Sequence, residues 1–255
     1  MASVLSRKQK KKDKYTLKEL KNLGRELLSS RAHINNLPLL LSFISSSSPP
    51  QYVLESLLSL QSFFTPLLPL LPLSLSKRSR TEQDPSEREE DPEVIYRTWL
   101  KSKFDDFVRS LIDLSVSRGS DDTLREVVLD ALMELAKRGS GGRFNSAIYH
   151  RFLHTFVHST EPASFLLDLL ASKYFKYIDV RYFTYVSMEK LVKALEAKNI
   201  SVDKVLRETA ENGLHSGESM KHSIHIYMIF ITHPALEVPS NYYHCAWCQE
   251  EPQGK

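Results

Sequence analysis

The stretch KYIDVRYFTYVSMEKLVKAL, residues 176–195, has apolar residues at helical spacing and no obvious catalytic group. Within it, DVRYFTYVSMEKL at 179–191 matches TLREVVLDALMEL at 123–135, an offset of 56 residues. The paired positions are Leu124 and Val180, Arg125 and Arg181, Val127 and Phe183, Ala131 and Ser187, Leu132 and Met188, and Leu135 and Leu191. An apolar face that includes a small residue is typical of the inner helix of a stacked helix pair. The match therefore favours HEAT-like repeats.

Two alternatives stay open for this stretch. Any two amphipathic helices can agree by chance, and the offset exceeds the HEAT and armadillo repeat length of roughly 40 to 47 residues. Asp179 and Arg181 are expected to have a structural role at a helix start, where Arg181 can bond a neighbouring turn. The aromatic residues Tyr182, Phe183 and Tyr185 are expected to fill the core and groove, with nucleotide stacking as the alternative.

Helical patterns extend over most of the chain. The sequence predicts helices over 16–30, 50–65, 92–117, 121–137, 145–158, 162–173, 176–195 and 202–212. Capping signals support several of these starts, among them a capping box from Thr16 to Glu19. The apolar faces expected to point inward include Leu28, Leu58 and Ile95. Because almost no segment alternates like a strand, we predict an all-α fold of HEAT/armadillo-like stacked helix pairs, an α-solenoid.

Composition changes divide the chain into five parts. We expect a disordered basic tail over 1–14, a helical hairpin over 15–73 and a charged flexible loop over 74–91. A helical-repeat domain over 92–214 and an irregular tail over 215–255 complete the division. The last segment has no helical period, so we expect it to be non-family sequence.

The overall composition is that of a globular protein, with 42% hydrophobic and 25% charged residues. The two cysteines, Cys245 and Cys248, provide no disulfide framework, which favours a reducing compartment. Prolines interrupt the leucine-rich stretch at 67–75, so we predict neither a transmembrane helix nor a membrane partner. No phosphate-binding loop, nucleophile elbow or apolar carboxylate pair is present, so we predict no enzymatic activity, small-molecule substrate or cofactor.

Two groups of side chains in the sequence could bind a metal. Cys245 and Cys248 have the spacing of half a zinc site but fall short of the usual four ligands, and no βαβ pattern supports a redox role. His150, His154 and His158 share one helical face, for which a half-exposed surface is the preferred interpretation. We therefore predict no metal site.

Basic residues are concentrated near the N-terminus. Arg7, Lys8, Lys10, Lys11, Lys12 and Lys14 stand against a single acid, Asp13. Such a cluster favours nuclear or nucleolar targeting, and direct contact with RNA phosphates is the second possibility. The alternative is a solvated basic tail that has no role in targeting or RNA binding.

Three segments together resemble a known family. IYRTWLKSKFDDFVRSLIDL at 95–114, RFNSAIYHRFLHTFV at 143–157 and the DVRYFTY segment resemble the nucleolar complex protein 4 family, one of the CCAAT-binding-factor-like families of ribosome assembly proteins, and are most similar to its plant members. The resemblance covers roughly residues 1 to 220 and rests on the order and wording of the segments.

The resemblance implies a helical-repeat scaffold of the nucleus and nucleolus that functions in pre-rRNA processing and small-subunit assembly. It also implies partners such as nucleolar protein fourteen, with pre-rRNA as a further possible contact. Because the large C-terminal half of the family proteins has no counterpart here, we expect a truncated form that cannot replace a full-length protein. The competing function is a cytoplasmic helical-repeat adaptor that binds peptide segments.

Overall fold

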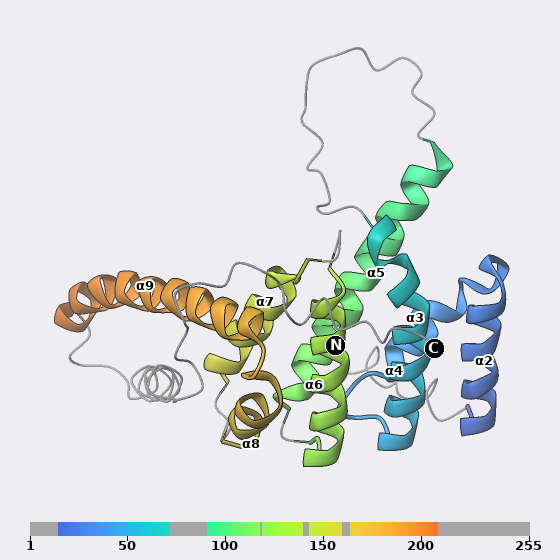
Figure 1. Ribbon diagram of the computed structural model, residues 1–255, viewed down its shortest axis with the longest axis horizontal. Coiled ribbons are helices and arrows are strands. Elements are labelled where there is room, and N and C mark those ends of the chain that lie inside the picture. The colour runs from blue at the N-terminus through green and yellow to red at the C-terminus, as the bar shows by residue number, and fades with distance from the viewer. Residues whose placement is uncertain (1–14, 72–90, 118, 140–142, 160–163, 209–255) are drawn as a thin grey trace, which may run out of the picture. The chain divides into compact units, whose positions relative to one another are not determined.

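The computed structural model describes residues 15–71, 91–117, 119–139, 143–159 and 164–208. These residues form helices and no strand (Figure 1), which confirms the all-α prediction. The expected basic tail over 1–14, residues 74–90 of the expected loop and residues 209–255 lie outside the described residues. Contacts divide the chain into two compact units: 1–114 with 139–141, and 115–138 with 142–255, so the first division falls inside a helix, between Leu114 and Ser115. The first part of the expected domain 92–214 thus belongs to the N-terminal unit.

The described residues of the N-terminal unit form four α-helices and two short 3-10 helices. They are α2 (Leu17–Ser29), η1 (Arg31–His33), α3 (Asn36–Phe43), α4 (Pro50–Phe64), η2 (Thr65–Leu70) and α5 (Pro92–Ser115), whose last residue lies beyond the unit. The predicted capping box begins α2: Thr16 Oγ1 accepts from Glu19 N at 3.3 Å, and Thr16 N donates to Glu19 Oε2 at 2.6 Å. These bonds satisfy amide groups that a helix start leaves free.

The core of this unit lies where α2, α3 and α4 pack against one another. Leu20, Leu40 and Leu57 are fully buried there. A Cβ added to Gly24 of α2 would lie 2.2 Å from Ser59 Oγ of α4, so the absence of a side chain permits the close approach of these helices. Phe64 connects α4 to α5, with its ring centroid 5.3 Å from Phe104 and 5.6 Å from Phe107.

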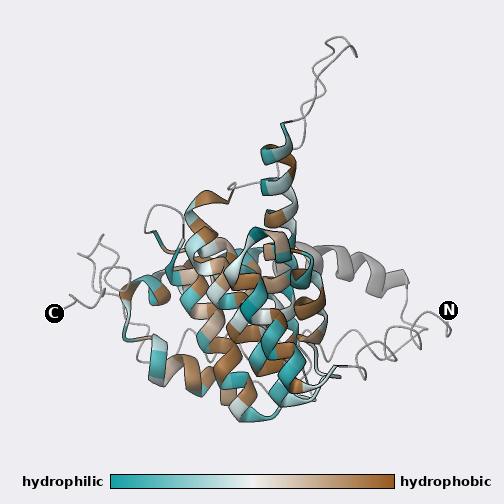
Figure 2. Ribbon diagram, turned by 90° about the vertical axis from the view of Figure 1, so that its right-hand side faces the viewer, coloured by the Kyte–Doolittle hydropathy of each residue, from teal (hydrophilic) through white to brown (hydrophobic). Residues whose placement is uncertain are grey.

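Two features of this unit differ from prediction. The hairpin expected over 15–73 contains a further helix, α3. Leu28, Leu58 and Ile95, expected to point inward, are exposed, because each lies beside the buried stripe of its helix. Figure 2 shows the alternation of apolar and polar residues along the helices that produces such stripes.

The part of the C-terminal unit that the structure describes contains the remaining helices. They are α6 (Asp122–Lys137), α7 (Ser146–Val157), α8 (Ser164–Leu169), the π-helical turn η4 (Leu170–Tyr174) and α9 (Ile178–Glu208). Asp121 caps α6 through a bond of 2.6 Å from Leu124 N, and Asn145 caps α7 through a bond of 3.3 Å from Ile148 N. Helix α6 packs on α7 and α8, and α7 packs on α9.

The two matched stretches occupy corresponding positions of α6 and α9. Leu124 and Val180, Ala131 and Ser187, Leu132 and Met188, and Leu135 and Leu191 are all buried. Val127 and Phe183 are half-buried, as are Arg125 and Arg181. Both stretches therefore present the same face to the core.

A buried hydrogen-bond chain joins α7 to α9. Thr184 Oγ1 donates to Val180 O at 2.7 Å, so its oxygen accepts from the hydroxyl of Tyr149, 2.6 Å away. Burial raises the pKa of Tyr149 above its ordinary value. Both hydroxyls are fully buried and bonded, so the contact fixes the pairing of these helices.

Two predictions about the opening stretch were wrong. Tyr182 and Tyr185, expected to fill the core and groove, are 51% and 64% exposed, because only one face of α9 meets α7. Phe183 alone packs inward, with its ring centroid 5.1 Å from Phe144. The separate helices expected over 176–195 and 202–212 are one continuous helix as far as Glu208.

The stretch Pro50–Leu70 is, by length and composition alone, apolar enough to cross a membrane. It consists of α4 and η2, and Val53, Leu57 and Phe64 are buried against the rest of the unit. A core helix passes the same test, so this one stretch is weak evidence for a membrane span.

Candidate functional site

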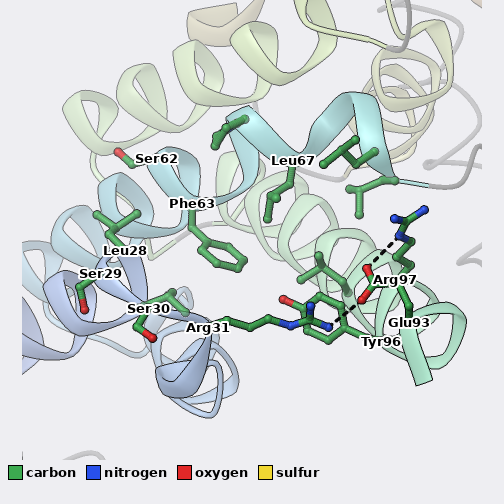
Figure 3. Close-up of a pocket in the computed structure, with 15 residues that line it drawn as sticks. Leu28, Ser29, Ser30, Arg31, Ser62, Phe63, Leu67, Glu93, Tyr96 and Arg97 are labelled. Atoms are coloured by element: carbon green, nitrogen blue, oxygen red, sulfur yellow. Dashed lines mark hydrogen bonds and ion pairs between the residues drawn. The ribbon is translucent and has the colours of Figure 1, made fainter.

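A pocket of about 470 Å³ opens in the N-terminal unit (Figure 3). Three walls surround it: the end of α2 with η1, the end of α4 with η2, and the first turns of α5. Its lining residues are Leu27, Leu28, Ser29, Ser30, Arg31, Ser62, Phe63, Pro66, Leu67, Leu70, Leu71, Glu93, Tyr96, Arg97 and Leu100. We call this the N-terminal pocket.

Apolar side chains make up much of the lining. Leu27 and Leu100 are buried, and Phe63 and Leu67 are half-buried. Figure 3 shows Phe63 and Leu67 directed into the hollow. Leu28 and Leu70 lie at the pocket with 50% and 60% of their surface exposed. The pocket thus offers apolar surface that water can reach.

A charged cluster forms the remaining side. Glu93 accepts one bond from Arg31 Nη2 and one from Arg97 Nε, each 3.0 Å long. The guanidinium of Arg31 also lies 3.6 Å from the ring centroid of Tyr96, a cation–π contact. These bonds to Arg31 and then Arg97 lower the pKa of Glu93, so it is a carboxylate at neutral pH.

Local structure holds this cluster in place. Ser30 Oγ accepts from Ala32 N at 3.2 Å, which caps the short η1 turn and so fixes the position of Arg31. At the start of α5, Asp91 Oδ1 accepts from Glu93 N at 3.0 Å. Glu93 and Arg97 are then one helical turn apart, the spacing at which such side chains pair.

A second charged cluster lies in the C-terminal unit. Lys173 of η4 donates to Asp130 at 2.6 and 2.8 Å and to Glu126 at 3.1 Å, and Tyr174 OH donates to Asp130. Partial burial lowers the pKa of Lys173, but these bonds outweigh it and raise the pKa above its ordinary value. Two consecutive residues of η4 thus bond to acidic side chains of α6. This structural role explains the cluster without a ligand.

The structure places the predicted helix-start residues as follows. Asp179 and Arg181 are the second and fourth residues of α9, and both are half-buried. In α6, the counterpart Arg125 donates from Nη2 to the carbonyl of Ser117 at 2.8 Å. The basic residues Arg7 to Lys14 lie outside the described residues.

The histidines of α7 lie along one side of that helix. The rings of His154 and His158 stack with centroids 4.3 Å apart, and both residues are at least partly exposed. Burial and, less strongly, the charge of Lys190 lower the pKa of His150. Among the described residues, no group of three histidine, cysteine or acidic side chains could hold a metal, and Cys245 and Cys248 lie outside them.

Residues 8–197 match the family model described as nucleolar complex protein 4-like, TPR repeats. The chain belongs to this family. The TPR description confirms the predicted helical-repeat fold, and it names a helix-pair repeat class other than the HEAT repeats that the sequence suggests. The matched range includes every lining residue of the N-terminal pocket and the cluster around Lys173. No solved structure matches the chain.

A plant relative shows the same family. The chain is 56% identical over 238 residues to the Arabidopsis thaliana protein named NUCLEOLAR COMPLEX ASSOCIATED 4. The matched region covers 93% of this chain and 40% of the relative. This nucleolar complex protein 4-like chain therefore spans well under half the length of that relative. Because the match covers 238 of 255 residues, it extends into the segment 215–255, which corrects the expectation that the resemblance ends near residue 220.

The sequence alone did not reveal the N-terminal pocket. Its lining residues come from three separate segments, 27–31, 62–71 and 93–100, and no spacing within any one segment indicates that they meet. The sequence predicts only the end of the helix 16–30 in the segment 27–31. Only the packing of α2, α4 and α5 brings Arg31 to Glu93, 62 positions later.

Proposed function

We propose that this chain acts as a non-enzymatic scaffold of ribosome biogenesis in the nucleolus, in small-subunit assembly and pre-rRNA processing. The observation that carries the proposal is the 56% identity to an Arabidopsis protein whose name places it with a nucleolar complex. Stacked helices support it, because they present long surfaces to partners. The clusters around Glu93 and Asp130 are ion-paired and hydrogen-bonded, and their geometry is explained by packing rather than by a reaction.

The proposed roles of particular residues follow from their charge. Arg7, Lys8, Lys10, Lys11, Lys12 and Lys14 direct the chain to the nucleolus or contact the phosphates of pre-rRNA. Asp179 and Arg181 stabilise the start of α9. Nucleolar protein fourteen is the proposed protein partner.

A fluorescent fusion of the whole chain tests the nucleolar part of this proposal. We expect nucleolar signal, and loss of most of it when the lysines and arginines of residues 7–14 are replaced by glutamine. A matched control replaces the same number of exposed basic residues elsewhere, beginning with Arg109 and Lys193. Purely cytoplasmic signal from the unchanged chain would contradict the proposal and favour the peptide-binding adaptor.

A further inference from the structure

The N-terminal pocket combines exposed leucines with exposed arginines. Leu28 and Leu70 keep half or more of their surface in water at its edge, although burial of such side chains is favourable. A pocket of about 470 Å³ also lies within the range of roughly 300–1,000 Å³ typical of binding sites. An incoming aliphatic side chain would therefore gain by entering it.

The charges of the lining select among such ligands. Arg31 and Arg97 stand against Glu93 alone, so the lining carries an excess of positive charge. Each guanidinium has five N–H donors and shows one bond to Glu93, and both side chains are exposed. An added carboxylate can thus form charge-assisted bonds without displacing Glu93, whereas an added ammonium group would be repelled.

The backbone of the walls limits the conformation of the ligand. All three walls are made of helices and helical turns, whose main-chain groups bond within the helices, and the described residues include no strand edge. A ligand chain cannot gain main-chain bonds by adding a strand, so it must satisfy its own backbone groups. An α-helix does this and can place its apolar face in such a pocket.

We propose that the N-terminal pocket binds an amphipathic helix of a partner protein, with two aliphatic residues three or four positions apart and an acidic residue on the same face. The aliphatic side chains pack between Phe63, Leu67 and Leu28, and the carboxylate bonds Arg31 or Arg97. This goes beyond the proposed function, because it specifies the chemistry of a partner and concerns the N-terminal unit alone.

Selection of peptides that bind the full chain tests this proposal directly. The probe is a phage-displayed library of random peptides of about 16 residues, long enough for a marginal helix. We expect enriched peptides to share the aliphatic pair and an acidic residue. The tightest of them, labelled and measured by fluorescence anisotropy, should bind about tenfold or more weakly to Leu28→Asp and to Arg97→Ala, the effect of losing an apolar anchor or a charge-assisted bond.

Matched control variants separate the pocket from general surface effects. Leu58 is 55% exposed on α4 of the same unit, and Arg109 is exposed on α5 and paired with Asp106, yet neither lines the pocket. Leu58→Asp and Arg109→Ala should therefore bind the peptide as the unchanged chain does. Because all four side chains are exposed, each variant should keep its helices, and circular dichroism checks this.

A charge reversal provides the sharpest result. Arg97→Glu should lose the acidic peptide and regain binding when the acidic residue of the peptide is changed to lysine. The inference is overturned if no peptide is enriched, if enriched peptides lack the acidic residue, or if the controls weaken binding equally. It is also overturned by a dimer of the chain that Leu28→Asp dissociates, because a second copy would then occupy the pocket. A cytoplasmic fusion that still binds the peptide would contradict only the proposed nucleolar function.

Discussion

Replacing the hydroxyls of Tyr149 and Thr184, separately and together, tests the pairing of α7 with α9. In Tyr149→Phe the buried Oγ1 of Thr184 keeps its bond to Val180 O and loses only the donor of Tyr149. We expect a cost of about 1 kcal/mol in local stability, the usual net value of one hydrogen bond. In Thr184→Val the fully buried hydroxyl of Tyr149 loses its acceptor, so we expect a loss of about 1–3 kcal/mol in local stability.

The double variant should cost less than the sum of the single variants. With valine at position 184, the hydroxyl of Tyr149 is a buried donor without a partner, and removing it also removes that penalty. The coupling between the two sites should therefore be about 1–2 kcal/mol, within the range for residues in contact.

Native-state hydrogen exchange provides the assay, because it reports the free energy of local opening helix by helix. Protection of amides in α7 and α9 should decrease in each single variant, while α2 of the other unit is the internal control. Additive single costs, or a neutral Thr184→Val, would refute the bonded pair and with it the described register of α7 on α9.

Three further predictions concern packing, capping and pH. Gly24→Val should destabilise the N-terminal unit by about 1–3 kcal/mol through overpacking against α4, and Ser59→Gly in the same chain should recover part of this in urea unfolding. Asp121→Ala should lower the stability of α6 by about 1 kcal/mol through loss of its N-cap, measured as faster exchange of the first amides of that helix. Because burial and Lys190 lower the pKa of His150, the unfolded chain binds a proton at higher pH than the folded chain, so stability should fall as pH decreases below about 6.5. His150→Gln should make the unfolding midpoint less dependent on pH between about pH 7 and 5. An equal dependence on pH in the variant and the unchanged chain would contradict this.

Helix starts were predictable where a side chain caps them. Thr16, Asp121 and Asn145 each accept a backbone N–H at the first turn of a helix, and short polar residues in such positions are a local signal. The burial match between α6 and α9 was predictable for a similar reason, because apolar spacing along one helix determines which face enters the core.

Helix α3 was missed because its sequence, NLPLLLSF, is apolar on nearly all sides and contains Pro38. The proline is the third residue of the helix, within the first turn, where a missing N–H costs no helical bond. The continuity of α9 was missed for the opposite reason: a break was expected, although no proline or glycine occurs between Ile178 and Glu208. The exposure of Tyr182 and Tyr185 depends on how far α7 covers α9, which no local pattern encodes.

The proposed role in small-subunit assembly is tested most directly by the RNA that accompanies the chain in cells. The measurement is purification of the tagged full chain from plant cells, followed by quantification of the pre-rRNA species recovered. The proposal predicts enrichment of small-subunit precursors over large-subunit precursors, relative to a tagged control of similar charge. Recovery of no precursor, or of large-subunit precursors alone, would contradict it.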